Sequence, residues 1–377
     1  AHWSDLAIVG MAGIFPGAPS LSDYWRLICK GVCEIGPVPK SRWITETFTS
    51  HDGKNVDGRS HSLSDRGAFL PPIEFDPIQF GIPPNSLAAI DPTQILALKV
   101  ASDALEDWGY FEHEDGNRVS VIFGVESGGD LASSGLRTLI PHYMGRLPRE
   151  FDEVLPAVTT DSFPGMLANV CAGRIANRLD LRGLNCTVDA ACGSSIAALN
   201  LAADELILGR CDVALAGAVD LHNAASDYVM FSSLGALSPT GEARVFDRSA
   251  DGIVLGEGAG CLVLKRLADA ERDGDPIHAV LRGIGTSSDG RALGLTAPRV
   301  DGQVLAFERA YKVGNIDRNL VGLIEAHGTG TAVGDSAEVT TIERIFEGDT
   351  RSKIRLGSVK AQIGHTKCAA GMAGVIK

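Results

Sequence analysis

The cysteine at position 192 stands where a strand-like segment passes into a helix-like one. It belongs to the motif NCTVDAACGSSI (185–196), between a strand-like run over residues 184–190 and a helix-like run over 194–208. Free backbone N–H groups at a helix N-terminus favour an anion, so we expect the pKa of the Cys192 thiol to be lowered. A thiolate is the nucleophile that acyl transfer requires. We expect Gly193 to allow a tight turn and the close approach of a substrate.

Two histidines lie in glycine-rich loops that follow apolar, strand-like runs. His327 lies in EAHGTGTAVGD (325–335) and His365 lies in KAQIGHT (360–366). A histidine in such a loop faces a cleft more often than it packs in a core. The alternative for Cys192 is a buried structural thiol, because free cysteines are among the most buried residues. The two histidines favour the functional interpretation: one nucleophile and two strand-end histidines form a catalytic constellation.

Several motifs, in order along nearly the whole chain, resemble the β-ketoacyl synthase family. They are AIVGMAGIFPG (7–17), IDPTQ (90–94), VDAACGSS (188–195), FDRSADG (246–252) with GEGAG (256–260), and the two histidine motifs. The chain is most similar to the ketosynthase domain of a type I polyketide or polyunsaturated-fatty-acid-type synthase. The segment FPGMLANVCAGRIANRLDL (163–181) resembles lipid-type iterative synthases more than modular ones.

The resemblance implies a decarboxylative Claisen condensation that elongates a polyketide or fatty-acid chain. Cys192 would take an acyl chain from a carrier-protein thioester, and the helix dipole and the N–H of Cys192 would stabilise the oxyanion that forms. A malonyl-carrier thioester would then lose carbon dioxide, and His327 and His365 would each donate an N–H to the enolate oxygen. A Cys-His-His set resembles elongating synthases, whereas Cys-His-Asn resembles initiating synthases and a second cysteine resembles thiolases.

The resemblance also assigns supporting residues. Thr329 and Thr331 match residues that hydrogen-bond the phosphopantetheine arm, with turn capping as the alternative. Lys360 and Glu338 match a lysine and a glutamate that pair near the histidines, with an ordinary structural ion pair as the alternative. We expect no metal and no cofactor bound by this domain, because its substrates are carried on the phosphopantetheine of an acyl carrier protein.

Two other functions stay open from the sequence. A catalytically inert ketosynthase-like partner could serve dimerisation or chain-length control, but such partners usually lack the nucleophile. A cysteine hydrolase would release acid from acyl thioesters without malonyl dependence. The glycines of GEGAG (256–260) do not form a dinucleotide loop, because an apolar strand-like run follows them instead of a helix. We expect them to allow the close packing of strands.

Composition restricts the partners. The chain has 377 residues, 45% of them hydrophobic, and a net charge of −13. Such an acidic chain argues against nucleic acid as a main partner. Its eight scattered cysteines indicate a reduced, cytoplasmic protein, and no apolar stretch is long enough to span a membrane. By resemblance we expect an acyl carrier protein, the other domains of a multidomain synthase and a second copy of the chain, in a homodimer, as partners.

Strand-like and helix-like runs alternate and predict an α/β fold with buried sheets. The expected strands cover residues 6–11, 120–125, 186–189, 213–218, 260–265, 278–284, 321–325 and 355–359, and the expected helices cover 92–107, 194–208, 303–311, 337–346 and 368–377. Residues 42–65 are expected to form a long loop. By resemblance the fold is thiolase-like, with two related halves of layered sheets and helices, and the strand over 213–218 lies at the two-fold interface of a dimer.

We place the boundary between the halves at residue 267, so that residues 1–267 carry the nucleophile and 268–377 carry both histidine motifs. The polar segment ADAERDGDP (268–276) forms the connection. The family continues past the second histidine motif into further strands and a glycine-rich loop carrying a phenylalanine. We therefore expect the printed chain to be a domain of a longer protein that lacks this C-terminal end and condenses poorly without it.

Overall fold

The centre of the fold is a mixed six-stranded sheet. The computed structural model describes residues 3–49, 61–110, 118–126, 135–291, 294, 296–348 and 354–377. The strand order is β5-β4-β6-β7-β1-β8, in which β5, β4 and β6 run parallel and β7, β1 and β8 pair antiparallel with their neighbours. The strands are β1 (Leu6–Ile14), β4 (Val119–Gly124), β5 (Asn185–Val188), β6 (Val213–Asp220), β7 (Gly258–Arg266) and β8 (Ala279–Leu281).

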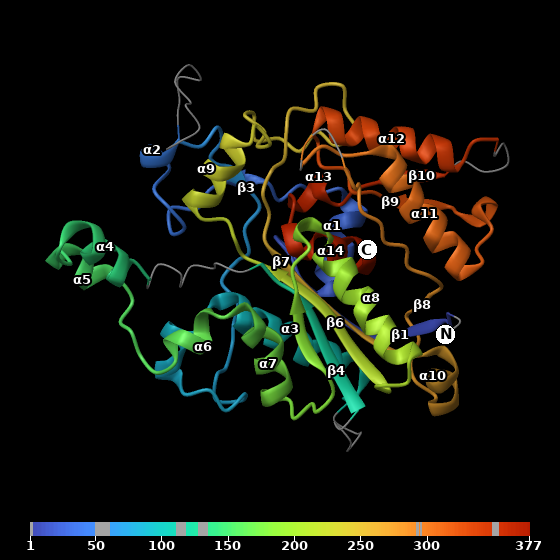
Figure 1. The fold of residues 1–377 in the computed structure, drawn as a ribbon, viewed down its shortest axis with the longest axis horizontal. Helices are drawn as coiled ribbons and strands as arrows, with labels where there is room; N and C mark the ends of the chain where they lie inside the picture. The colour runs from blue at the N-terminus through green and yellow to red at the C-terminus, as the bar shows by residue number, and fades with distance from the viewer. Residues whose placement is uncertain are drawn as a thin grey trace.

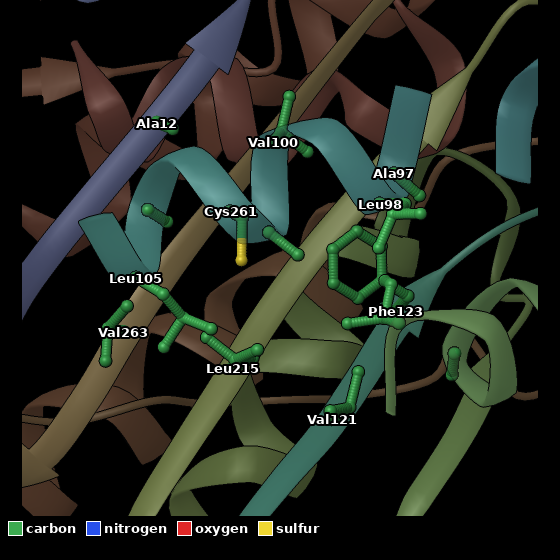
Figure 2. Close-up of a cluster of buried hydrophobic side chains, with 14 of the residues drawn as sticks. Ala12, Ala97, Leu98, Val100, Leu105, Val121, Phe123, Leu215, Cys261 and Val263 are labelled. Carbon is green, nitrogen blue, oxygen red and sulfur yellow. The ribbon is translucent and has the colours of Figure 1, made fainter. Parts of the chain in front are cut away.

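Helices cover both faces of this sheet, which explains why several of its strands are apolar throughout. One face packs against α3 (Pro92–Trp108) and α7 (Ala168–Arg178), and the other against α8 (Ser194–Ile207) and α14 (Ala370–Ile376). Figure 2 shows Leu98 and Leu105 of α3 among Phe123, Leu215 and Val263 of the sheet. The sheet is therefore the middle layer, and the nucleophile helix α8 is one of its covers.

A smaller parallel pair of strands carries the histidine loops. β9 (Leu323–Glu325) pairs with β10 (Arg355–Gly357), and α11 (Val300–Gly314) packs beside α12 (Ala332–Ile345) in this region (Figure 1). The chain then runs through α13 (Lys360–Ile363) and a 3-10 turn (Lys367–Ala369) into α14. The C-terminal strands and helices thus bring both histidine loops to the side of the sheet that α8 covers.

The sequence did not predict several shorter elements. The helices are α1 (Leu21–Lys30), α2 (Thr45–Phe48), α4 (Leu136–Met144), α5 (Arg149–Val154), α6 (Ser162–Met166), α9 (Ala225–Ser233) and α10 (Leu267–Asp273); the strands are β2 (Gly36–Pro37) and β3 (Arg66–Gly67). Helices α4 and α5 project from the body as an arm (Figure 1), and the arm exposes Tyr143, Met144 and Val154.

Two expectations about the fold need correction. Strand β6, which contains residues 213–218, lies between β4 and β7 and is buried along its whole length, so the prediction that it lies at a dimer interface is wrong. Residues 42–65 were expected to form a loop, but they contain α2 where the structure describes them; 50–60 lie outside the described residues. No helix in the described ranges is long and apolar enough to cross a bilayer.

Candidate active site

Cys192 lies in a 3-10 turn (Ala191–Gly193) between the end of β5 and the start of α8. Side chains on both sides hold this turn. Asp189 accepts a hydrogen bond from the N–H of Ala191 at 2.9 Å, and Ser194 Oγ accepts from Ala190 N–H at 2.9 Å and donates to Ala191 O at 2.7 Å. The predicted strand-to-helix position of Cys192 is therefore present, and its turn is braced.

The unusual backbone conformation in this turn is adopted by Ala191 and not by Gly193. Ala191 has a φ of 50°, in the left-handed region that residues with a Cβ rarely adopt. Gly193 is an ordinary residue in this respect, with a φ of −88°. The expectation that Gly193 permits the tight turn is thus wrong. Gly193 instead lines a cavity beside Cys192, where a side chain would occupy space.

Burial raises the pKa of the Cys192 thiol, which contradicts the expectation of a lowered value. The positive charges of Lys360 and Lys367 act in the opposite direction but do not outweigh burial. A buried thiol is disfavoured as an anion because it loses the solvation of bulk water. The free enzyme therefore holds Cys192 as a thiol, and an acylation step needs a group that accepts its proton.

His365 is fixed at both its backbone and its ring. Its N–H donates to Val254 O at 2.7 Å, and its carbonyl accepts from Gly256 N–H at 3.0 Å. Its Nδ1 accepts a hydrogen bond from the backbone N–H of Lys367 at 3.0 Å. Burial, followed by the charge of Lys360, lowers the pKa of His365 well below its usual value. The ring is therefore neutral, and its single proton lies on Nε2.

Nε2 of His365 is buried and has no hydrogen-bond partner among the described residues. A buried N–H without a partner is costly, so such a group is often reserved for a ligand. His365 also lines a cavity of about 710 Å³ together with Cys192 and His327. We infer that this N–H is available to a substrate oxygen in that cavity.

His327 follows β9 on a loop that Glu338 holds from α12. The two carboxylate oxygens of Glu338 accept the backbone N–H groups of His327 and Gly328, at 2.6 and 2.7 Å. The ring of His327 is exposed to the cavity, but many protein atoms surround it and displace bulk water. This desolvation, followed by the charge of Lys360, lowers the pKa of His327 to about 4. The ring of His327 meets that of His365 edge to face, with centroids 5.4 Å apart.

The three predicted catalytic side chains converge. The sulfur of Cys192 and one nitrogen of each histidine all lie within 4.8 Å of one another. Three such donors at this spacing could also ligate a metal ion. However, a metal requires a nitrogen lone pair, and the free nitrogen of His365 carries its proton because Nδ1 is occupied. The set fits N–H donation to an oxyanion better than metal binding.

The supporting residues lie around the same site, with one correction. Thr329 and Thr331 line the cavity that Cys192 lines, and their hydroxyl groups hydrogen-bond each other at 3.0 Å. Thr331 precedes α12, but its side chain makes no capping hydrogen bond, which disfavours the turn-capping alternative. Lys360 is buried beside a second cavity of about 520 Å³ that also contains Cys192 and His327.

Glu338 does not form the expected ion pair with Lys360. No contact within 4.0 Å joins the two side chains, both of which the structure describes, and both oxygens of Glu338 hold the His327 loop instead. Burial lowers the pKa of Lys360, although the nearby Cys192 and Glu338 act to raise it. Lys360 therefore affects the site through its positive charge and not through an ion pair with Glu338.

Two residues of the site were not predicted from the sequence. Buried Asp335 accepts the backbone N–H groups of Thr329 and Gly330, at 3.0 and 3.1 Å, and that of Phe246 at 2.6 Å, so it shapes the loop after His327. Lys367, close to His365 in the chain, is the second. Its position at a loop beside a candidate histidine was a visible signal, whereas its burial was not.

Two family models match most of the chain. A family model described as the N-terminal domain of β-ketoacyl synthase matches residues 4–270, and one described as its C-terminal domain matches residues 278–377. The chain is 37% identical to a polyunsaturated fatty acid synthase of Thraustochytrium sp. and 39% identical to a phenolphthiocerol/phthiocerol polyketide synthase of Mycobacterium tuberculosis. Each match covers 99% of this chain but only 14% and 20% of the respective relative.

Solved structures are similar over the same span. The oxazolomycin ketosynthase domain OzmH KS7 of Streptomyces albus JA3453 superposes with a TM-score of 0.87 at 30% identity. The ketosynthase from module 6 of the bacillaene synthase of Bacillus subtilis 168 superposes with a TM-score of 0.84 at 34% identity. Both cover 99% of this chain, which spans 61% and 60% of those chains. The thiolase-like α/β fold expected from the sequence is confirmed.

Proposed function

The chain belongs to the β-ketoacyl synthase family, and from that membership we propose that it catalyses decarboxylative condensation of a Cys192-bound acyl chain with a malonyl thioester. The observation that supports this most strongly is the cavity shared by Cys192, His327 and His365, with a buried, unpartnered N–H on His365. Such a donor suits an oxygen that gains negative charge during the reaction. The inert-partner and hydrolase alternatives have no observation in their favour.

In the first half-reaction, the Cys192 sulfur attacks the carbonyl carbon of an acyl thioester. Because burial raises the pKa of the thiol, its proton passes to a neutral base, and His327 is the neutral imidazole that lines both cavities beside Cys192. The proton then passes to the leaving pantetheine sulfur, so that His327 is neutral again when the acyl enzyme has formed. The nearby charge of Lys360 favours the developing thiolate.

In the second half-reaction, a malonyl thioester loses carbon dioxide and its electron pair moves onto the thioester oxygen. The Nε2–H of His365 and an N–H of His327 donate to this enolate oxygen. The enolate carbon then forms a bond with the acyl carbon, and the bond from that carbon to Cys192 sulfur breaks. The product is a β-ketoacyl thioester, and the Cys192 thiolate takes a proton from solvent water to return to the thiol.

The substrates in this proposal arrive on the phosphopantetheine arm of an acyl carrier protein. The hydroxyl groups of Thr329 and Thr331 line the cavity that leads to Cys192 and suit the amide groups of such an arm. The partners are this carrier and the other domains of a multidomain synthase, the localisation is the cytoplasm, and the domain itself holds no cofactor. The proposed halves are residues 1–267 and 268–377.

We also propose a homodimer, but through β5 and not through β6. No described strand pairs with the outer side of β5, and an open edge of a sheet offers unpaired N–H and C=O groups to another chain. The arm of α4 and α5 adds exposed apolar side chains. Light scattering should give twice the chain mass at micromolar concentration; a stable monomer of the full-length protein would contradict this proposal.

The condensation itself can be tested with the full-length protein, an acyl-loaded carrier and a malonyl-loaded carrier. We expect the wild type to form a β-ketoacyl product and carbon dioxide in equal amounts, and Cys192→Ala to form no β-ketoacyl product. The control is the hydrolysis of the acyl carrier in the absence of malonyl carrier. Free acid at the same rate with and without the malonyl carrier would contradict the proposal and indicate a hydrolase.

A further inference from the structure

A buried ion pair lies directly behind His365. The ammonium group of Lys367 is 3.1 Å from Asp220 Oδ1, and both side chains are almost completely buried. Lys367 also donates to Asn223 Oδ1 at 3.0 Å and to the carbonyl of Gly256 at 2.9 Å. The ammonium thus has three oxygen atoms around it, in a region that belongs to neither of the two cavities around Cys192.

This pair fastens the turn after His365 to the central sheet. Asp220 is the last residue of β6, and its Oδ2 accepts the backbone N–H of Cys368 at 3.1 Å. Gly256, which accepts from the Lys367 ammonium, also donates its N–H to the carbonyl of His365. The side chain of Lys367 therefore ties the turn to two backbone segments that lie far apart in the sequence.

The same turn sets the ring of His365. The backbone N–H of Lys367 is the donor that occupies His365 Nδ1 and so leaves the ring proton on Nε2. Lys367 has a φ of 45°, in the left-handed region, which is unfavourable for a residue with a Cβ. Such a conformation persists only where neighbouring contacts hold it. The contacts that hold it here are those of the Lys367 ammonium.

Stability alone does not account for a pair of this kind. Burying two charges costs solvation energy that their attraction only partly recovers, so apolar residues would often stabilise a core as well or better. A metal ion is also a poor explanation of this cluster. Asp220 and His222, with Glu126, are close enough for a shared cation, but the Lys367 ammonium already occupies the position beside Asp220.

We propose that the Asp220–Lys367 pair is a positioning device for the reaction: it holds the turn whose N–H fixes the ring orientation and tautomer of His365. This inference rests on the proposed function, because it assigns the enolate oxygen to His365 Nε2–H. Lys367 and Asp220 touch no substrate in this scheme. They act through His365, so their loss should affect the step that needs this N–H more than it affects acylation of Cys192.

The first variant is Lys367→Gln in the full-length protein. Carbon dioxide release from a malonyl carrier should fall about 10- to 100-fold, as on loss of a group that orients a metal-bound histidine. Acylation of Cys192 should fall much less, because the thiolate loses one nearby positive charge and keeps that of Lys360. Lys367→Arg should largely restore decarboxylation, because it keeps a positive charge beside Asp220 and leaves both Asp220 oxygens free to accept the backbone N–H groups of His222 and Cys368. Lys312→Gln, at an exposed position of α11, is the matched control.

Equal losses of acylation and decarboxylation in Lys367→Gln would show a merely structural role and overturn the inference, as would unchanged decarboxylation. If Lys367→Gln does not fold, Lys367→Arg decides. A folded Lys367→Arg variant should keep the wild-type ratio of the two rates, and a ratio as low as that of His365→Ala overturns the inference. A wild-type protein that acylates Cys192 but releases no carbon dioxide would instead overturn the proposed function, and this inference with it.

Discussion

At the scale of single residues, the site combines a thiol that resists ionisation with two histidines that resist protonation. Burial is the first cause of all three pKa shifts; the charge of Lys360 adds to the downward shift of both histidines and opposes the upward shift of Cys192. Neutral histidines can donate an N–H to an enolate oxygen, and one of them can accept the thiol proton. Protonated histidines could donate an N–H but could not accept the thiol proton. The burial of the site is therefore part of its chemistry.

Replacing His365 by alanine should separate the two half-reactions. The variant loses the Nε2–H donor to the enolate, so decarboxylation should fall on the order of a hundredfold or more, as is typical for one oxyanion donor. Acylation of Cys192 should fall much less, because the proposed proton acceptor is His327. Release of labelled carbon dioxide and acyl transfer to Cys192 measure the two steps. A larger loss in acylation would assign the base to His365 instead.

His222 should make the stability depend on pH. Burial opposes its protonation, but the hydrogen bond and charge of Asp220 outweigh burial and raise the pKa to about 9 from 6.5. The folded state thus binds this proton more tightly than the unfolded state. The resulting stabilisation is fully present below pH 6.5 and is lost as the pH rises through about 9.

The matching experiment compares the free energy of unfolding of His222→Gln with that of the wild type. The deficit of the variant should shrink by roughly 2 kcal/mol or more between about pH 6 and pH 10, since one pKa unit corresponds to about 1.4 kcal/mol. His142→Gln, on the exposed arm helix α4, is the control for replacing a histidine by glutamine. A constant deficit across this range would contradict the proposed charge on His222.

At the scale of elements, the sequence predicted the strands and long helices well because their apolar patterns are strong. All eight expected strands are present, and the expected helices at α3 and α8 begin at the residues predicted. The short helices were missed, although α1 has signals that could have been read: Ser20 caps its start and Gly31 ends it with a left-handed conformation.

Less of the candidate site than of the strands and long helices could be predicted from the sequence. Cys192, His327 and His365 could be predicted as candidates because their types and loop positions are local properties, and the structure brings the three side chains together. The sequence could not identify the left-handed conformation of Ala191 or the burial of Lys367, because both depend on contacts from distant elements. The pKa of Cys192 was mispredicted for the same reason: the helix terminus is visible in the sequence, whereas the burial of the thiol is not.

The turn that carries Cys192 gives a prediction at this scale. In the left-handed conformation of residue 191, valine costs about 1–2 kcal/mol more than glycine. Ala191→Val should therefore shift the turn, lower the stability and slow acylation of Cys192. Ala191→Gly should acylate at least as fast as the wild type, because glycine adopts this conformation without strain. Acylation slowed equally by both variants would show that the conformation of residue 191 does not matter.

At the scale of the whole molecule, the central sheet and the C-terminal strands have different tasks. The sheet holds Cys192 at the end of β5 and Asp220 at the end of β6, whereas the loops after β9 and α13 supply the two histidines. Cys192 lies more than 130 positions before either histidine in the sequence, and the fold brings all three side chains to one candidate site. We propose that this convergence makes Cys192 the residue to which the acyl chain is covalently attached.

The most direct test is peptide mass spectrometry of the full-length protein after exposure to an acyl-loaded carrier protein. The account predicts an acyl mass on the peptide that contains Cys192, removed when a malonyl carrier is added, and no acyl mass after Cys192→Ala. The other cysteines provide an internal control, since Cys186 and Cys368 lie near the same turn without sharing its cavity. Acylation on Cys186 or Cys368 in place of Cys192 would contradict the account.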